Sequence, residues 1–180
     1  SMMRERLKAY YPGAKFLKPH TGENFNIGNC NIQILLTHED MIPMSDEKMY
    51  LGMNETSTVA KFSFDGVSLL ILADIPDPNG IKLTQVYENE PLSCTYIQAA
   101  HHMINRVEEV YRFTSADTVL IPRWDKTIEG ENYEVLCKYY DSEKFTAAGA
   151  GTVEFFIHDG NVTQTKKYPP FIKEYDNSGI

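Results

Sequence analysis

The sequence predicts an α+β fold: a mixed, largely antiparallel sheet built from hairpins and covered by helices. Three observations predict it. Tight-turn signals lie between apolar segments, one strand-like segment is apolar at nearly every position, and helix-like stripes separate the later strands. The 180 residues suit one domain, which we expect to span residues 4–165.

The first predicted element is a short helix near the N-terminus. Residues 4–11 are rich in helix formers and stop at Pro12-Gly13, which is typical of the last turns of a helix. We interpret residues 1–3 as a remnant of tag cleavage, and we expect the chain to be a piece of a longer protein, although a naturally short chain would look similar. Residues 166–180 contain a Pro-Pro pair and predict an extended or disordered tail.

Three hairpins follow from the turn residues. The dipeptides Gly28-Asn29, Asp65-Gly66 and Asp159-Gly160 each separate two apolar segments. These residue types accept the positive φ that a tight hairpin turn needs. The predicted strand pairs are residues 24–27 with 31–37, 56–64 with 67–73, and 153–157 with 162–165.

The remaining elements are interior strands and helices. The segment 67–73 is almost wholly apolar, which predicts burial on both faces of the sheet. Two more interior strands are expected at 95–100 and 118–121, and helices at 82–89, 104–113 and 131–140.

Composition excludes several classes of protein. The formal charge of −8 disfavours a nucleic-acid or anionic-lipid surface, and no apolar run reaches the ~18 residues that span a bilayer, so no membrane contact is expected. The chain contains three cysteines, an odd number, which do not make a disulfide framework. They favour a reducing compartment such as the cytoplasm.

Asp74 is the first residue with chemical content. It follows the apolar strand 67–73, where a chain leaving a sheet delivers side chains to a site. A carboxylate there needs a partner, a hydrogen bond or a metal. The alternative is that Asp74 caps the Ile75-Pro76-Asp77-Pro78 turn.

His101 and His102 end the strand 95–100. Imidazole is a common metal ligand and acts as an acid or base near neutral pH. In an extended chain neighbouring side chains point to opposite sides, so one histidine would face the site and the other would pack or face solvent. The alternative is a buried polar group with an ordinary hydrogen-bond partner.

Asn54 and Ser57, in the segment Asn54-Glu55-Thr56-Ser57, enter the strand before the second hairpin and are candidates for the rim of the same site; a polar turn is the alternative. Other patterns fail. His38-Glu39-Asp40 lacks the second histidine of a metalloprotease helix, no glycine-rich phosphate loop occurs, and neither Ser57 nor the cysteines have partners that would suggest a catalytic triad.

In order, these segments resemble the C-terminal half of a metallo-β-lactamase-fold domain, of the branch found in bacterial competence DNA-uptake channel proteins and their stand-alone relatives. That branch has an Asn-x-x-Ser segment, a glycine-containing hairpin, a Leu-Leu-Thr-Gly-Asp-like strand end and a His-His-Gly-Ser segment. The present chain has Asn54 to Ser57, Asp65-Gly66, Leu70-Ile71-Leu72-Ala73-Asp74, and His101-His102-Met103-Ile104. The similarity runs from about residue 22 to residue 162, including a strand at 115–122 and a closing hairpin at 149–160.

The resemblance implies a zinc-dependent hydrolase. It implies that Asp74 corresponds to a bridging metal carboxylate, and that His101 or His102 corresponds to a late metal ligand or a neighbouring substrate-contacting histidine. The chain departs from the family in two ways. The His-x-His-x-Asp-His cluster is absent from its 180 residues, and Ala73 and Met103 replace the motif glycines.

Zinc sites use three or four protein ligands, so we expect the fragment to bind zinc weakly or not at all and to be inactive alone. The family fold is a sandwich of two sheets, so an isolated half would expose several hundred Å² of apolar sheet face. At ~25 cal/mol per Å², covering that face is worth several kcal/mol. We therefore expect a homodimer or association with the missing N-terminal half-domain.

Two alternatives remain. One is a non-catalytic binding or oligomerisation module on the same fold. The other is an unrelated α+β domain with a structural Asp74 and histidine pair, which predicts that these residues lie far apart.

Overall fold

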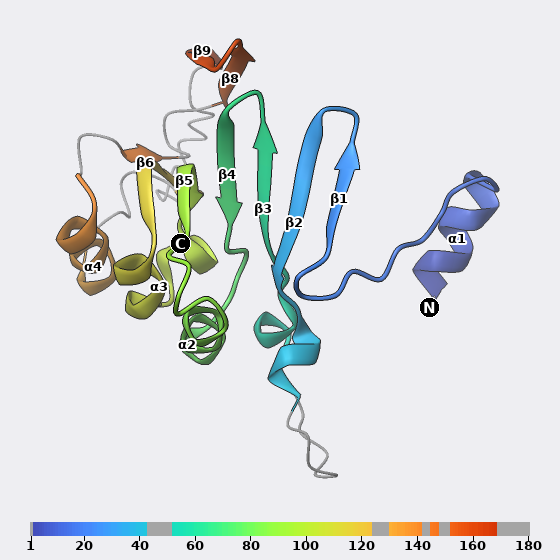
Figure 1. The fold of residues 1–180 in the computed structure, drawn as a ribbon, viewed down its shortest axis with the longest axis horizontal. Coiled ribbons are helices and arrows are strands. Elements are labelled where there is room, and N and C mark those ends of the chain that lie inside the picture. The colour runs from blue at the N-terminus through green and yellow to red at the C-terminus, as the bar shows by residue number, and fades with distance from the viewer. Residues whose placement is uncertain (1, 43–51, 124–129, 142–144, 148–151, 169–180) are drawn as a thin grey trace, which may run out of the picture.

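The computed structural model describes residues 2–42, 52–123, 130–141, 145–147 and 152–168, and it has an α+β architecture. A seven-stranded mixed sheet is formed in chain order, from β1 to β7 (Figure 1). Its antiparallel half contains β1 (Asn24–Ile27), β2 (Cys30–Leu36), β3 (Val59–Phe64) and β4 (Val67–Ile71). Its parallel half continues from β4 through β5 (Ser93–Gln98), β6 (Ser115–Ile121) and β7 (Phe145–Ala147).

All three predicted hairpins are present. The Asp-Gly turns have the positive φ that their sequence predicts, with Asp65 and Asp159 both at 48°. The third hairpin consists of β8 (Thr152–His158) and β9 (Asn161–Tyr168) and forms a separate two-stranded sheet. Its strand β9 includes the first residues of the predicted tail, whose residues 169–180 lie outside the described part of the chain.

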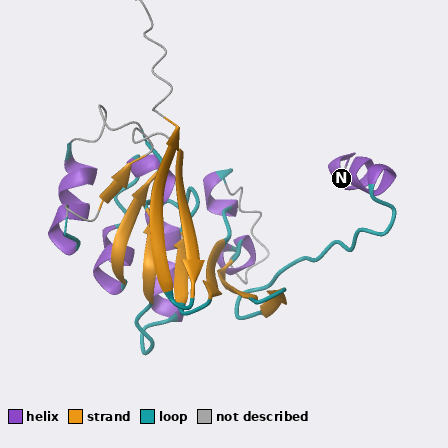
Figure 2. Ribbon diagram, turned by 90° about the horizontal axis from the view of Figure 1, so that it is seen from above, coloured by secondary structure: helices purple, strands orange, loops and turns teal. Residues whose placement is uncertain are grey.

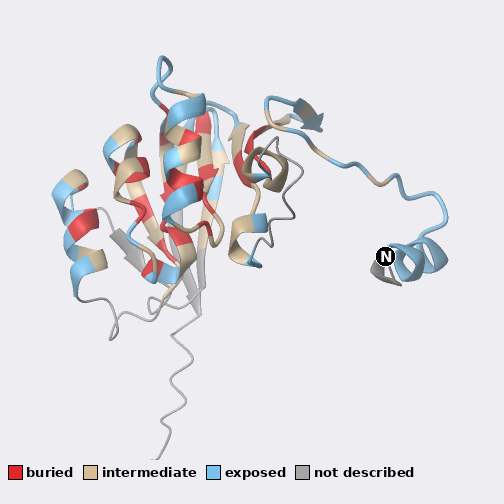
Figure 3. Ribbon diagram, turned by 90° about the horizontal axis from the view of Figure 1, so that it is seen from below, coloured by how far each residue is buried: buried red, intermediate tan, exposed pale blue. Residues whose placement is uncertain are grey.

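Three helices cover one face of the main sheet (Figures 2 and 3). They are α2 (Asp77–Val86), α3 (Glu108–Phe113) and α4 (Glu131–Tyr139). The buried residues concentrate between these helices and the sheet, as expected for a layered core. Gly80 permits the close approach of α2 to α3, since an added Cβ would lie 2.9 Å from a methyl carbon of Val107.

The helix boundaries correct two predictions. Helix α2 begins at Asp77, five residues earlier than predicted, because Pro78 stands in its first turn, where a missing N–H costs nothing. Helix α3 begins at Glu108 instead of residue 104, because Val107 has a left-handed backbone with φ 37°.

The prediction that the strand 67–73 is buried on both faces is wrong for part of one face, where Val67 is buried but its neighbours are not. Leu70 and Leu72 are fully buried under the helices, whereas Leu69 and Ile71 on the opposite face are only half-buried. The β8–β9 hairpin covers part of that second face, with the ring centroids of Tyr96 and Phe155 4.9 Å apart. An apolar cavity of about 190 Å³ remains between the hairpin and the sheet.

The N-terminal helix α1 (Met2–Tyr10) lies apart from the sheet at the end of an extended segment (Figure 1). That segment is attached to the body at a 3₁₀ turn (His38–Met41), where Glu39 accepts hydrogen bonds from Lys18 and His20. These pairs hold the pKa of Glu39 below its usual value. Among the described residues, no helix is long and apolar enough to cross a bilayer.

Candidate functional site

The predicted site residues gather at one edge of the main sheet. Strands β4 and β5 are parallel neighbours, so their carboxyl ends meet at the same edge. Asp74 follows β4, and His101 and His102 follow β5 in a short turn (Ala100–Met103). The parallel pairing therefore brings together groups that are 27 and 28 residues apart in the sequence.

Asp74 and His102 face each other. The Asp74 Oδ1 and His102 Nε2 atoms are 3.8 Å apart, and both side chains are about half exposed. The hypothesis that Asp74 and the histidine pair are unrelated structural residues predicts that they lie far apart. The observed separation of 3.8 Å between Asp74 and His102 does not fit that hypothesis. A direct hydrogen bond is excluded at this distance, because such bonds lie near 2.7–3.2 Å.

A backbone carbonyl determines which nitrogen of neutral His102 carries the proton. His102 Nδ1 lies 2.8 Å from the carbonyl oxygen of Pro122, at the end of β6. A carbonyl only accepts, so Nδ1 is the donor. In neutral His102 the lone pair therefore belongs to Nε2, the nitrogen that faces the Asp74 carboxylate.

His101 has a different partner. The amide of Asn54 lies 3.5 Å from His101 Nδ1, at the long limit for a hydrogen bond. An amide nitrogen donates, so Nδ1 accepts and the proton of neutral His101 is on Nε2. Ser57 donates its backbone N–H to the Asn54 carbonyl at 3.0 Å, and no hydrogen bond among the described residues joins its side chain to the histidines.

The expectation that the two histidines point to opposite sides of an extended chain is wrong. Strand β5 ends at Gln98, and residues His101, His102 and Met103 all have left-handed backbones, with φ of 44°, 49° and 62°. The two imidazole rings approach edge to face with centroids 6.3 Å apart. Both histidines therefore lie at the rim.

The left-handed run is held by hydrogen bonds from several elements. Left-handed geometry costs roughly 1–2 kcal/mol per residue, so it persists only where the surroundings compensate. The His101 N–H donates to the Ala73 carbonyl at 2.9 Å. The Asn132 side-chain amide in α4 donates to the carbonyls of Met103 and Ile104, at 2.7 and 2.9 Å.

Sequence reasoning missed these supporting residues. Asn132 comes from a helix about 30 residues downstream, and no local pattern connects it with the histidines. Gln98 was more accessible to prediction, since it is a polar residue at the end of an interior strand. Its side chain accepts hydrogen bonds from the N–H groups of Leu72 and Ala73, at 3.0 and 2.8 Å.

Tyr111 also helps to hold the turn Ala100–Met103 in place. Its buried hydroxyl accepts a hydrogen bond from the Ala100 N–H at 3.0 Å. Burial raises the pKa of Tyr111 well above its usual value, so the hydroxyl is neutral at physiological pH.

Two candidate metal-ligand atoms face each other at this edge of the sheet, Asp74 Oδ1 and His102 Nε2. The group of three side chains whose spacing could hold a metal ion, among the described residues, lies at the opposite end of β4: Asp65, His158 and Asp159, all exposed. None of the three cysteines pairs in a disulfide, and burial raises the pKa of the Cys94 thiol to about 11, so it is protonated and a poor nucleophile.

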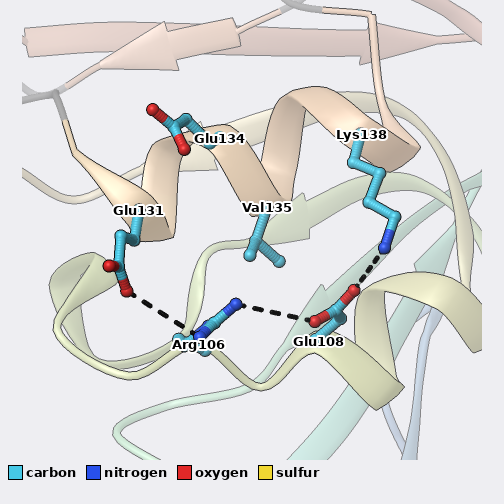
Figure 4. A pocket seen from close by; sticks show the side chains of 6 residues that line it. All are labelled: Arg106, Glu108, Glu131, Glu134, Val135 and Lys138. Carbon is cyan, nitrogen blue, oxygen red and sulfur yellow. Dashed lines mark hydrogen bonds and ion pairs between the residues drawn. The ribbon is translucent and has the colours of Figure 1, made fainter.

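A polar hollow of about 400 Å³ lies between α3 and α4 (Figure 4). Four of the charged side chains that line it form ion pairs: Arg106, Glu108, Glu131 and Lys138. Glu108 accepts from Lys138 at 2.7 Å and lies 3.9 Å from Arg106, which also lies 3.8 Å from Glu131. The Lys138 ammonium holds the pKa of Glu108 below its usual value. These exposed pairs join α3 and the segment before it to α4, and pairs so open to solvent stabilise a fold little.

Comparison with protein-family models, with curated proteins and with solved structures gives no match to this chain. The chemistry of the site is therefore read from its own residues: a carboxylate, an imidazole nitrogen with a lone pair, and a second imidazole fixed by an amide.

We predict that replacing Tyr111 with phenylalanine destabilises the protein by roughly 1–3 kcal/mol, because the buried Ala100 N–H loses its acceptor. Chemical denaturation measures this loss. Tyr10→Phe is the matched control, since Tyr10 is 81% exposed, and its stability should change by less than about 0.5 kcal/mol. Equal stability of the Tyr111 variant and the parent protein would mean that the Tyr111 hydroxyl is not the acceptor of the Ala100 N–H.

Proposed function

We propose that this chain is the C-terminal portion of a metal-dependent, zinc-type hydrolase of the metallo-β-lactamase superfamily. The observation that carries the proposal is the pairing of Asp74 with the lone-pair nitrogen of His102 at the ends of two parallel strands. The separation of 3.8 Å between two acceptor atoms favours a shared cation.

The backbone of the two motifs supports the same relationship. Ala73 and Met103 stand where the resembling family has glycine, and both adopt positive φ, 53° and 62°. Glycine reaches this region without steric cost. The chain thus keeps a backbone shape that glycine favours, although neither position is glycine.

The donor set fits zinc in kind and falls short in number. Carboxylate oxygen and imidazole nitrogen are both ordinary zinc ligands. The carbonyl of Pro122 on the other nitrogen of His102 is the type of outer partner that orients a ligating histidine. Asp74 and His102 supply two ligands, and three or four are needed.

In the proposed site, Asp74 and His102 would hold zinc, with the remaining ligands supplied by the absent half of the domain. His101, fixed by Asn54 with its Nε2 protonated, would contact the substrate or donate a proton to the leaving group. When bound, zinc supplies Lewis-acid activation of water for attack on an ester, amide or phosphodiester.

We predict that the chain alone binds Zn²⁺ weakly, and that Asp74→Ala and His102→Ala each weaken this binding further. Isothermal titration calorimetry tests the prediction. The titrations are made in a His158→Ala background, because Asp65, His158 and Asp159 form a competing exposed group. Asp117→Ala is the matched control, an exposed aspartate on β6.

Two results would contradict this account in different ways. Tight stoichiometric binding abolished by Asp74→Ala would mean that the chain supplies a complete ligand set. Weak binding that is indifferent to both site substitutions would mean that Asp74 and His102 form an ordinary surface ion pair.

A binding or oligomerisation module is the second candidate function, and the second face of the sheet favours it. Phe62, Phe64 and Leu69 lie on this face, where Phe64 is 38% exposed. The β8–β9 hairpin covers part of it, with an apolar cavity of about 190 Å³ between hairpin and sheet. We propose that a second copy of the chain, or the missing half-domain, covers the rest.

We predict that the chain self-associates to a dimer at tens of micromolar, because burying the remaining apolar area is favourable. Light scattering measures the mass. Phe64→Glu should shift the protein to monomer. Phe156→Glu is the matched control, since Phe156 is 58% exposed and alternates with Phe155 to the outer side of the hairpin. A monomeric parent chain would contradict the prediction.

The two candidate functions differ in what precedes this segment in the parent gene. The hydrolase requires a His-x-His-x-Asp-His cluster upstream, whereas the binding module does not. The N-terminal part of the parent open reading frame therefore distinguishes them.

A further inference from the structure

The side chain of Gln98 spans the gap between the ends of β4 and β5. Gln98 is the last residue of β5 and is half-buried. Its oxygen accepts from the N–H groups of Leu72 and Ala73, at 3.0 and 2.8 Å. Its nitrogen donates to the carbonyls of Ala73 and Ala99, at 3.4 and 2.8 Å. One amide thus satisfies four backbone groups.

These four groups lie where the sheet can no longer pair them. Strand β4 ends at Ile71, and its parallel register with β5 is recorded at Leu69 and Leu70. Backbone groups left unpaired near the core carry a free-energy cost. The Gln98 amide therefore replaces the backbone hydrogen bonds that β4 and β5 would form if their pairing continued.

The same contacts reach the two halves of the site. Ala73, which precedes Asp74, has φ 53°, and Gln98 binds both its N–H and its carbonyl. The Ala73 carbonyl also accepts from the His101 N–H at 2.9 Å. Gln98 thus hydrogen-bonds directly to Ala73, in the turn that carries Asp74. Ala73 in its turn accepts from His101, in the turn that carries His102.

We propose that Gln98 is the positioning residue of the site: its amide holds Ala73 in the left-handed conformation that turns Asp74 toward His102. The part of this inference that concerns the metal rests on the proposed function, whereas the backbone part does not. The Gln98 side chain acts on the site through the backbone of Ala73, so its role is to position Asp74 and not to bind the metal.

The test uses nuclear magnetic resonance on the full chain with two variants. Gln98→Met keeps the length of the side chain and removes all four hydrogen bonds. Gln98→Glu keeps the oxygens that accept from Leu72 and Ala73 and removes the donated bonds. Gln33→Met in β2 is the matched control, a half-buried glutamine in another strand.

The first readout is amide hydrogen exchange. In Gln98→Met the amides of Leu72 and Ala73 should exchange about tenfold faster, as loss of an acceptor implies, while the amides of β2 and β3 keep their rates. Gln98→Glu should retain the protection in part, because one carboxylate oxygen still accepts from Leu72 and Ala73 while the other is repelled by the Ala73 and Ala99 carbonyls. An even acceleration throughout the protein, or unchanged exchange at Leu72 and Ala73, would overturn the proposal.

The second readout is the shift of the Asp74 and His102 signals on addition of Zn²⁺. These shifts should be seen in the parent chain and in Gln98→Glu, and should be lost in Gln98→Met; their persistence in Gln98→Met would overturn the positioning role. If the parent chain itself shows no shift while the exchange pattern is as expected, the proposed zinc function fails and the backbone role of Gln98 stands. If Gln98→Met does not fold, Gln98→Asn, which keeps the amide but shortens its reach, takes its place with the same expected results.

Discussion

The structure of the site depends on one constraint: two neighbouring parallel strands end at the same edge, and the chain must leave both there. The hydrogen bond from the His101 N–H to the Ala73 carbonyl joins the two segments that leave these strands. Because each exit is left-handed, Asp74 and His102 face each other instead of pointing along the strands. If this bond or the handedness of either turn were lost, the donor pair would separate, whatever ligands the rest of a parent protein provided.

The cost of these left-handed turns explains why so many polar groups surround them. Each such residue costs roughly 1–2 kcal/mol, and the compensation comes from distant elements: Gln98 from β5, Tyr111 from α3 and Asn132 from α4. The helices therefore have two roles: they cover the hydrophobic core, and α3 and α4 supply hydrogen bonds that hold the turn carrying His101 and His102. Strain concentrated and braced in this way is typical of functional sites.

The sequence predicted what local chemistry determines. Glycine-containing turns predicted the hairpins, and residues that follow apolar strands predicted Asp74 and the histidines as neighbours. It could not predict the left-handed run at His101, His102 and Met103, because non-glycine residues with positive φ are uncommon and the enrichment of histidine there is too small to predict three in succession. It also missed the hairpin β8–β9 covering the sheet, since the contact of Phe155 with Tyr96 joins residues 59 positions apart.

Neutral His102 turns the lone pair of Nε2 toward Asp74 because the Pro122 carbonyl binds its other nitrogen, Nδ1. Long-range proton–nitrogen correlation of His102, recorded where the ring is neutral, reports directly which nitrogen carries the hydrogen. We expect a protonated Nδ1 and an unprotonated Nε2. A protonated Nε2 would contradict this assignment, since that nitrogen would then have no lone pair to offer a metal beside the Asp74 carboxylate.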